Sequence, residues 1–368
     1  MFETLLNAVD LTCLKKNIYT ASTADVERVL QKQHCTHKDF PVLISPAASD
    51  FIETMASRSR QITALRFGKT VRMYAPLYIS NECVNACAYC GFNVHNATPR
   101  TTLNHDQVLA EADILHKQGF RHLLLVSGEH RTHVPVEFIA DIARTLREKF
   151  AALSIEVYPM ETAEYRLLAE SGITSIAVYQ ETYDRTSYAR LHKGPKADFD
   201  YRLATPERAV HAGLREVGIG ALLGLSDHRL DLALLAQHAA YLMKAYWKAQ
   251  ISISFPRIRK AAGNFSPAET ITDPQLAQAV FALRMVLPDA DLVLSTRENQ
   301  TFRNGMAGLG ITRMSAGSRT NPGGYSKSDD ALEQFAIDDC RSAAEVAAML
   351  DQKGLEPVWK DFDRSFLA

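Results

Sequence analysis

The sequence of 368 residues has no long hydrophobic run, no excess of either charge and little cysteine. Its 41 basic and 42 acidic residues give a formal net charge of −1, which argues against a broad nucleic-acid-binding surface. The longest clean apolar stretch, residues 218–225, is far too short to span a bilayer. Residues 1–14 lack the basic start and apolar core of a signal peptide. These absences predict a soluble cytoplasmic protein with neither a membrane nor a nucleic-acid partner.

The six cysteines are too unevenly placed for a disulfide framework. Cys13, Cys35 and Cys340 are scattered and are interpreted as ordinary thiols, whereas the other three fall within eight residues. The twelve histidines show no metal-ligand spacing. Hydrophobic residues make up 46% of the sequence, so the chain can bury a sizeable core as one large domain or two small ones.

The clustered cysteines, Cys83, Cys87 and Cys90, have the spacing C-x3-C-x2-C. Thiolates this close can face one centre from a single loop, and thiolate ligands select zinc or iron–sulfur clusters. A cubane cluster held by three thiolates keeps one iron open to a small molecule. A structural zinc would need a fourth ligand, for which His95 is the nearest candidate. The loop favours the open cluster, because it follows a strand-like run and carries an aromatic residue, Tyr89, directly before the last cysteine.

From residue 71 onward, apolar runs of strand length alternate with amphipathic helical segments. This alternation is typical of an α/β fold with parallel strands and right-handed crossovers, and eight repeats predict a closed (β/α)8 barrel. We expect a helical segment over residues 1–70, the barrel over residues 71–320 and a C-terminal helical extension over residues 321–368. Residues 183–204 are expected to form a long polar loop. The expected strands are residues 71–79, 122–126, 153–158, 173–179, 216–223, 250–255, 291–294 and 311–315.

Polar residues follow the predicted strands at the end where barrels carry their chemistry. Gly128-Glu129 follows the second strand, in register with the cysteine loop, and Gln180-Glu181 follows the fourth strand. Taken alone, Gly128-Glu129 is equally consistent with a strand-ending turn that carries a surface glutamate. Their common position predicts one shared active site at this end of the barrel.

Ser295-Thr-Arg297 follows the seventh predicted strand. An arginine can bind a carboxylate through two parallel hydrogen bonds, and a nearby hydroxyl can add a third. The sequence therefore allows a clamp for the carboxylate of an amino acid. It allows equally well a structural ion pair, for example between Arg297 and Glu298.

The cysteine loop resembles the signature of the radical S-adenosylmethionine (SAM) enzymes, C-x3-C-x-aromatic-C. The resemblance implies a [4Fe-4S] cluster whose open iron binds SAM. It also implies a Gly-Glu pair after the second strand that meets the methionine end of SAM. The residues so implied are Cys83, Cys87 and Cys90 for the cluster, and Tyr89, Gly128, Glu129 and, as a SAM or substrate contact, Glu181.

Longer stretches resemble one family, the 2-iminoacetate synthases, which are the tyrosine lyases of thiamine thiazole biosynthesis. The resemblance implies cleavage of the Cα–Cβ bond of L-tyrosine to 2-iminoacetate (dehydroglycine) and p-cresol, while SAM yields 5′-deoxyadenosine and methionine. It implies that Ser295 and Arg297 bind the tyrosine carboxylate. It further implies a one-electron donor of the flavodoxin or ferredoxin type and thiazole synthase as a protein partner. The matching stretches are residues 45–49, 76–92, 123–130, 178–183, 220–227, 254–257, 294–298 and 322–325.

Three alternatives compete with this interpretation. The related tyrosine lyases of hydrogenase assembly carry a C-terminal extension with cysteines for a second cluster, whereas only Cys340 lies beyond the expected barrel here. The thiamine interpretation is therefore favoured over that one. Another radical SAM lyase of aromatic amino acids remains open. So does a protein of a different class, a non-catalytic zinc-binding protein that uses the three clustered cysteines and His95.

Overall fold

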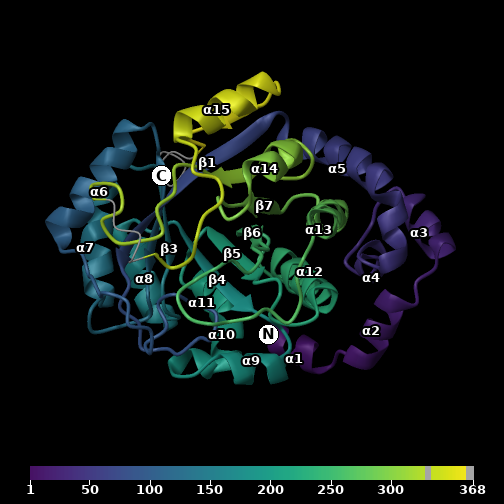
Figure 1. Cartoon of the computed structure of the whole chain (residues 1–368), viewed down its shortest axis with the longest axis horizontal. Coiled ribbons are helices and arrows are strands. Elements are labelled where there is room, and N and C mark those ends of the chain that lie inside the picture. The colour runs from purple at the N-terminus through teal and green to yellow at the C-terminus, as the bar shows by residue number, and fades with distance from the viewer. Residues whose placement is uncertain (328–332, 362–368) are drawn as a thin grey trace.

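The computed structural model describes residues 1–327 and 333–361 and confirms the predicted (β/α)8 barrel (Figure 1). All strand pairs are parallel, and the barrel closes because β1 pairs with both β8 and β2. A further short strand, β9, which was not predicted, pairs with the first residues of β1. The strands are β1 (Thr70–Ser80), β2 (His122–Ser127), β3 (Ala152–Glu156), β4 (Ser175–Glu181), β5 (Glu216–Ala221), β6 (Gln250–Ser254), β7 (Asp291–Leu294), β8 (Arg313–Ser315) and β9 (Glu356–Val358).

Helices surround the barrel and also form the predicted N-terminal segment. The prediction of a loop over residues 183–204 was wrong, because Asp184 and Asp198 cap two helices there by accepting backbone hydrogen bonds. The helices are α1 (Phe2–Asn7), α2 (Leu11–Tyr19), α3 (Thr23–Leu30), α4 (Phe40–Leu43), η1 (Pro46–Phe51), α5 (Ile52–Phe67), α6 (His105–Lys117), α7 (Val136–Leu146), α8 (Thr162–Ser171), α9 (Arg185–Leu191), η2 (Pro195–Ala197), α10 (Phe199–Leu203), α11 (Thr205–His211), α12 (His228–Ala245), α13 (Asp273–Val286), α14 (Gln300–Met306) and α15 (Ala343–Gln352). Within the described residues, no helix has the length and apolar character needed to cross a membrane.

The strands separate a packed outer layer from a polar interior. In β3, Leu153 and Ile155 are fully buried against the surrounding helices. Ser154 and Glu156 point the other way and line cavities inside the barrel. Alternate residues of a strand point to opposite faces, so each barrel strand contributes both to the core and to the interior.

The N-terminal helices lie beside α12 and α13, on the right of Figure 1. Backbone carbonyl groups at the end of α4 accept hydrogen bonds from buried side chains of the barrel helices. Gln278 of α13 donates to Leu43 (3.0 Å) and Ser45 (2.9 Å), and Arg229 of α12 donates to Ile44. This segment is therefore attached to the barrel by specific buried contacts.

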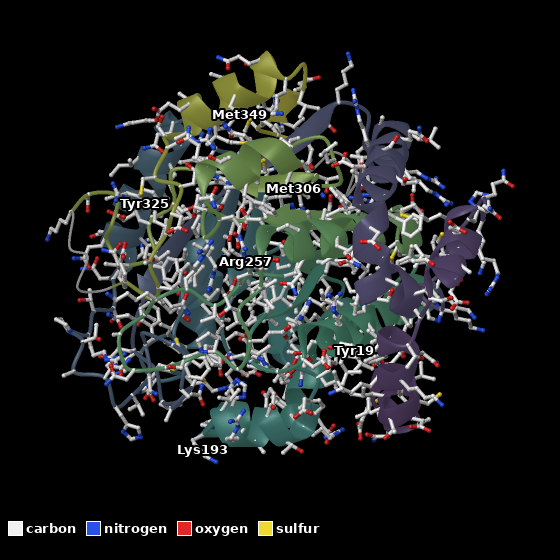
Figure 2. The ribbon with its side chains drawn as sticks, turned by 45° about the vertical axis from the view of Figure 1, so that its right-hand side comes forward. Tyr19, Lys193, Arg257, Met306, Tyr325 and Met349 are labelled. Carbon is white, nitrogen blue, oxygen red and sulfur yellow. The ribbon has the colours of Figure 1, made fainter. Side chains whose placement is uncertain are left out.

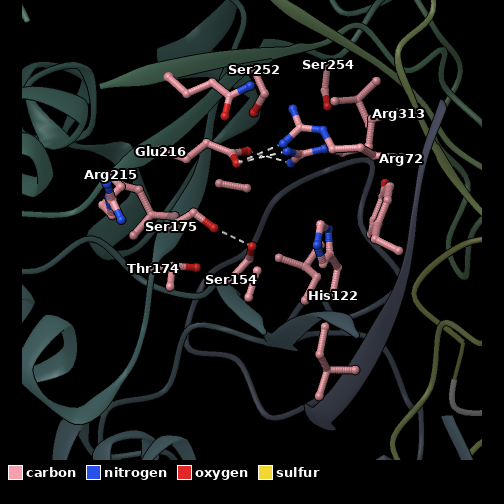
Figure 3. Close-up of a pocket in the computed structure, with 18 of the residues that line it drawn as sticks. Arg72, His122, Ser154, Thr174, Ser175, Arg215, Glu216, Ser252, Ser254 and Arg313 are labelled. Carbon is pink, nitrogen blue, oxygen red and sulfur yellow. Dashed lines mark hydrogen bonds and ion pairs between the residues drawn. The ribbon is translucent and has the colours of Figure 1, made fainter. Parts of the chain in front are cut away.

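A partly buried ionic cluster lines the barrel interior at the amino ends of the strands, around a cavity of about 360 Å³ (Figure 3). Glu216 accepts hydrogen bonds from Arg313, and Arg72 pairs with Asp361 at 2.9 Å. His122 lies 2.7 Å from the same Asp361 carboxylate. The chain that follows β9 thus closes the barrel at the end opposite to the cysteine loop.

Candidate active site

The cysteine loop leaves the carboxyl end of β1 and is fixed by backbone hydrogen bonds to two neighbouring segments. The amide of Val84 donates to the carbonyl of Glu129 (3.1 Å), just after β2. The amides of Ala86 and Ala88 donate to the carbonyls of Lys193 (3.1 Å) and Leu191 (3.0 Å), at the end of α9. The loop is therefore held between the ends of β2 and α9, at the face where barrel enzymes carry their chemistry.

The three sulfur atoms lie in a largely enclosed environment. Cys87 is buried, and Cys83 and Cys90 are partly buried. The amide of Asn85 donates to Cys83 Sγ (3.5 Å), and Gln334 Nε2 donates to Cys90 Sγ (3.8 Å). Burial raises the pKa of the Cys87 and Cys90 thiols, and the Lys196 ammonium opposes that rise. Bound iron would replace the thiol proton and supply the missing positive charge, so these residues fit a cluster site.

A zinc site built on the same cysteines is not supported. Among residues 1–327 and 333–361, no group of three or more His, Cys, Asp or Glu side chains is arranged to hold a metal ion, and this includes the three cysteines with His95. His95 is exposed. Each thiolate of a cubane binds a different iron, so cluster ligands lie further apart than the ligands of one ion.

Gly128 and Glu129 lie directly against the cysteine loop. A Cβ atom at Gly128 would stand 2.2 Å from the carbonyl oxygen of Glu82, so only glycine fits between β2 and the loop. The Glu129 carboxylate accepts hydrogen bonds from Asn85 (2.9 Å) and Arg202 (2.8 Å). The Gly-Glu pair predicted from the sequence is thus part of the support of the loop.

Glu181 ends β4 at φ 70°, the only positive φ of a non-glycine residue in the described part of the chain. Backbone strain of this kind is retained where the surroundings enforce it, commonly at functional sites. Its carboxylate pairs with Lys196 at 2.7 Å. Burial alone would raise the pKa of Glu181, but Lys196 and Arg202 hold it below its ordinary value. Both cations come from the segment predicted to be a loop, and the sequence reasoning missed them.

Tyr89 belongs to the cysteine loop itself and contacts the segments around His192 and Phe265. Its hydroxyl is 2.8 Å from His192 Nε2, and its ring packs edge-on against Phe265. Lys196 Nζ lies 6.0 Å from the centre of the ring. Tyr89 therefore connects the cysteine loop to the Lys196–Glu181 pair.

Arg297 follows β7 and is partly buried without an anionic partner in the described structure. Its guanidinium group stacks on Phe335, 3.3 Å from the ring centre. The ion pair with Glu298 that the sequence left open does not form. Glu298 instead pairs with Arg257 and with Arg259, the latter at 2.9 Å; Figure 2 shows Arg257 near the middle of the molecule. The N–H donors of the Arg297 guanidinium group are therefore available to bind another group.

Ser295 and Arg297 line one cavity of about 80 Å³ with Glu156, Tyr78 and Tyr179. This cavity adjoins the larger one at the amino ends of the strands. Both are lined by Tyr74, Leu124, Tyr179, Ser254 and Val293.

Tyr78 connects the cavity to the cysteine loop, because Cys83 and Cys90 pack against the cluster formed by Tyr78, Phe92 and Val126. The structure therefore brings the predicted cluster ligands and the predicted carboxylate clamp to one end of the barrel. Glu156, which the sequence reasoning missed, lines the same cavity as Ser295 and Arg297.

Sequence comparisons agree with this combination of barrel and cysteine loop. Residues 77–236 match the Radical SAM superfamily, and residues 254–356 match the Biotin and Thiamin Synthesis associated domain. The fold and the cysteine loop thus define a radical SAM enzyme.

Within that class, the chain belongs to the 2-iminoacetate synthase family. It is 43% identical to the 2-iminoacetate synthase of Salmonella typhimurium over 352 residues, which are 95% of this chain and 93% of the relative. It is equally identical to that of Escherichia coli over 357 residues, 96% of this chain and 95% of the relative. Among solved structures, the [FeFe]-hydrogenase maturase HydG superposes with a TM-score of 0.91 at 29% identity, covering 98% of this chain and 84% of HydG.

Proposed function

We propose that the protein is a radical SAM lyase that cleaves the Cα–Cβ bond of L-tyrosine and releases 2-iminoacetate and p-cresol. The observation that carries this proposal is the 43% identity to 2-iminoacetate synthases over nearly the whole chain. The geometry is consistent with it, because a partly buried arginine without an anionic partner in the described structure lies in a cavity beside the cysteine loop.

In this proposal Cys83, Cys87 and Cys90 would hold a [4Fe-4S] cluster that binds SAM. When bound, this cofactor pair would supply the radical chemistry, and the protein residues bind and orient the reactants. Gly128 and Glu129, at the end of β2, pack against the cysteine loop and support it. Lys196 lies near the ring of Tyr89, within the loop, and pairs with the carboxylate of Glu181.

Arg297 and Ser295 are proposed to bind the carboxylate of tyrosine. Arg297 has a free guanidinium group, and Phe335 supports that group from one face. A guanidinium group binds a carboxylate through two parallel hydrogen bonds, which fixes the orientation of the bound carboxylate. The aromatic side chains of Tyr78 and Tyr179 in the same cavity provide surfaces for the phenol ring.

We further propose two partners, an external one-electron donor of the flavodoxin or ferredoxin type and thiazole synthase. Water attacks the C=N bond of 2-iminoacetate readily, so the free product is short-lived. Transfer of the product directly to thiazole synthase would limit that loss.

The test is an anaerobic reaction of the reconstituted protein with SAM, a reductant and tyrosine. We expect p-cresol and 5′-deoxyadenosine in equal amounts, with glyoxylate as the hydrolysis product of 2-iminoacetate. Tryptophan in place of tyrosine should give no cleavage, and cleavage of tryptophan would favour a different aromatic-amino-acid lyase. Iron, sulfide and zinc analysis of the anaerobically purified protein would decide against the proposal if zinc were the main metal.

A further inference from the structure

Glu156 is a partly buried acidic residue that neither the fold nor the proposed cluster site explains. It is the last residue of β3, and its side chain lines the cavity that also contains Ser295 and Arg297. Within residues 1–327 and 333–361, its carboxylate accepts no hydrogen bond and forms no ion pair. A carboxylate inside a barrel without a partner is costly, because water no longer solvates it.

The other acidic residues around Glu156 already have partners. Glu298, which lines the same cavity, pairs with Arg257 and Arg259. Glu181 pairs with Lys196 at 2.7 Å. In the described residues that line this cavity, Glu156 is therefore the carboxylate that remains available to a ligand.

Glu156 and Arg297 influence each other electrostatically but are not bonded. Burial raises the pKa of Glu156 to about 7, the negative charge of Glu181 adds to this, and the charges of Arg297, Lys196 and Arg202 oppose it. Burial lowers the pKa of Arg297, and the charges of Tyr78 and Glu156 oppose that fall. A cation and an anion are thus held in one cavity with a gap between them.

A gap between a fixed cation and a fixed anion is complementary to the two charged groups of an α-amino acid. We propose that Glu156 binds the α-ammonium group of the substrate while Arg297 binds its α-carboxylate, an inference that rests on the proposed function and extends it. The ammonium group then pairs with the carboxylate for which the described residues provide no partner. With both groups of the α-carbon held, the side chain of the substrate is directed towards the aromatic lining of the cavity.

The variant Glu156→Gln tests this directly, because glutamine keeps the shape of glutamate and removes its charge. Binding is measured by equilibrium dialysis on the cluster-containing protein with SAM and without reductant, so that no turnover occurs. The ligands are tyrosine, tyramine (no carboxylate) and 3-(4-hydroxyphenyl)propionate (no amino group). We expect Glu156→Gln to weaken tyrosine and tyramine binding by roughly tenfold to a hundredfold. Binding of 3-(4-hydroxyphenyl)propionate should be unchanged or stronger.

Ser154→Ala is the matched control, because Ser154 lies on the same strand and also faces the barrel interior, but in the other cavity. It should bind all three ligands like the unaltered protein.

Equal weakening of the binding of tyrosine and of 3-(4-hydroxyphenyl)propionate in Glu156→Gln would mean that Glu156 contacts the phenol, and would overturn the proposal. Unchanged tyrosine binding in Glu156→Gln would overturn it as well. If either of these two results is obtained while the unaltered protein forms p-cresol, only the role of Glu156 is overturned and the proposed function stands. Absence of both tyrosine binding and p-cresol in the unaltered protein overturns both.

Discussion

At the scale of single residues, the site contains charges that the protein alone leaves unsatisfied. Arg297 stacks on Phe335 instead of pairing with an acid, and Glu156 faces the same cavity without a hydrogen bond in the described structure. Glu129 and Glu181, in contrast, are neutralised by Arg202 and Lys196. Unpaired charges that are partly withdrawn from water lower stability, and their presence in one cavity is consistent with the proposed binding of a ligand that carries both charges.

The cost of Glu156 should be measurable as a pH-dependent loss of stability. Its pKa is raised from 4.5 to about 7 in the folded protein, so folding disfavours its ionised form. The penalty is therefore absent below pH 4.5, grows as the pH rises and is complete above about pH 7. We expect Glu156→Gln to increase the free energy of unfolding by roughly 2–4 kcal/mol at pH 8 and not at pH 4.5. Urea unfolding without substrate measures this, and equal stabilisation at both pH values would contradict it.

Arg297→Ala should weaken tyrosine binding more than SAM binding. A lost charge-assisted hydrogen bond costs about 1.5–3 kcal/mol, which is roughly tenfold to a hundredfold in affinity. Arg297→Lys keeps the charge without the planar donor pair, so we expect it to restore only part of the affinity. Equilibrium dialysis with labelled tyrosine and labelled SAM provides the comparison. An equal loss of both ligands would place Arg297 outside the substrate site.

At the scale of secondary structure, the sequence predicted the elements whose hydrophobic pattern is regular and missed those without one. The eight barrel strands repeat an apolar run followed by an amphipathic helix, and all were predicted. The helices α9 and α10 are short and polar, and only the capping residues Asp184 and Asp198 indicated them. β9 has three residues, too few for a pattern to emerge.

The residues of the candidate site were likewise predictable where the sequence pattern is regular and were missed where it is not. The cysteine loop could be predicted because its ligands are adjacent in sequence, and Ser295 with Arg297 because they follow a clear strand. Lys196 and Arg202 lie in the missed helices and reach the site only through the fold. Glu156 was not recognised as a site residue because the third strand was expected to continue to residue 158. In the structure this strand ends at Glu156, so Glu156 lies at its carboxyl end. A charged residue at an inward position of a barrel strand is the signal that could have revealed it.

Loss of the cluster should leave the barrel folded, because the cysteine loop is outside the main hydrophobic core. Of its three cysteines, none belongs to the buried residues of that core. We expect alanine at Cys83, Cys87 or Cys90 to abolish SAM cleavage and reduce bound iron, with the far-ultraviolet circular dichroism spectrum unchanged. His95→Ala is the control and should retain iron and activity, since His95 is exposed. Full iron content and activity in any cysteine variant would contradict the assignment.

The ionic cluster at the amino ends of the strands should contribute to stability and not to catalysis. Burial opposes ionisation of Glu216, but Arg313 and Arg72 lower its pKa to about 2. Its contribution is therefore present at neutral pH and is lost as the pH falls from about 4.5 towards 2. We expect Glu216→Gln to lower the free energy of unfolding at pH 7 by roughly 3 kcal/mol, because it leaves partly buried guanidinium groups less compensated.

A matched control for this variant is Glu164→Gln, which removes a half-exposed ion pair with Arg131. Exposed pairs contribute only about 0–1 kcal/mol, so this variant should be nearly as stable as the unaltered protein. Both variants should retain their iron content and SAM cleavage at a temperature where they are folded. Loss of SAM cleavage in folded Glu216→Gln would contradict a purely structural role.

At the scale of the whole molecule, the N-terminal helices and the barrel form one packed structure. Phe2 stacks on His238 of α12 at 4.1 Å, and its amide donates to Glu207 of α11 (2.8 Å). The side chain of Ser59 in α5 donates to Leu309, near β8. Contacts of this kind join α1, α4 and α5 to helices that also cover the barrel, so separate stability of the two parts is not expected.

We therefore expect a single cooperative unfolding transition that includes residues 1–70. Hydrogen exchange should show similar protection in α5, which packs on α13, and in α13 itself, because opening either one exposes the other.

A chain that begins at residue 52 would leave the polar side chains of Arg229 and Gln278 without the carbonyl groups of Ile44, Leu43 and Ser45. Such buried donors cost about 1–3 kcal/mol each when unpaired, and the apolar surface under α1 to α4 would also become exposed. The shortened chain should accordingly give little folded protein. An early calorimetric transition that disappears in a folded, active shortened chain would show instead that the N-terminal helices are an independent unit.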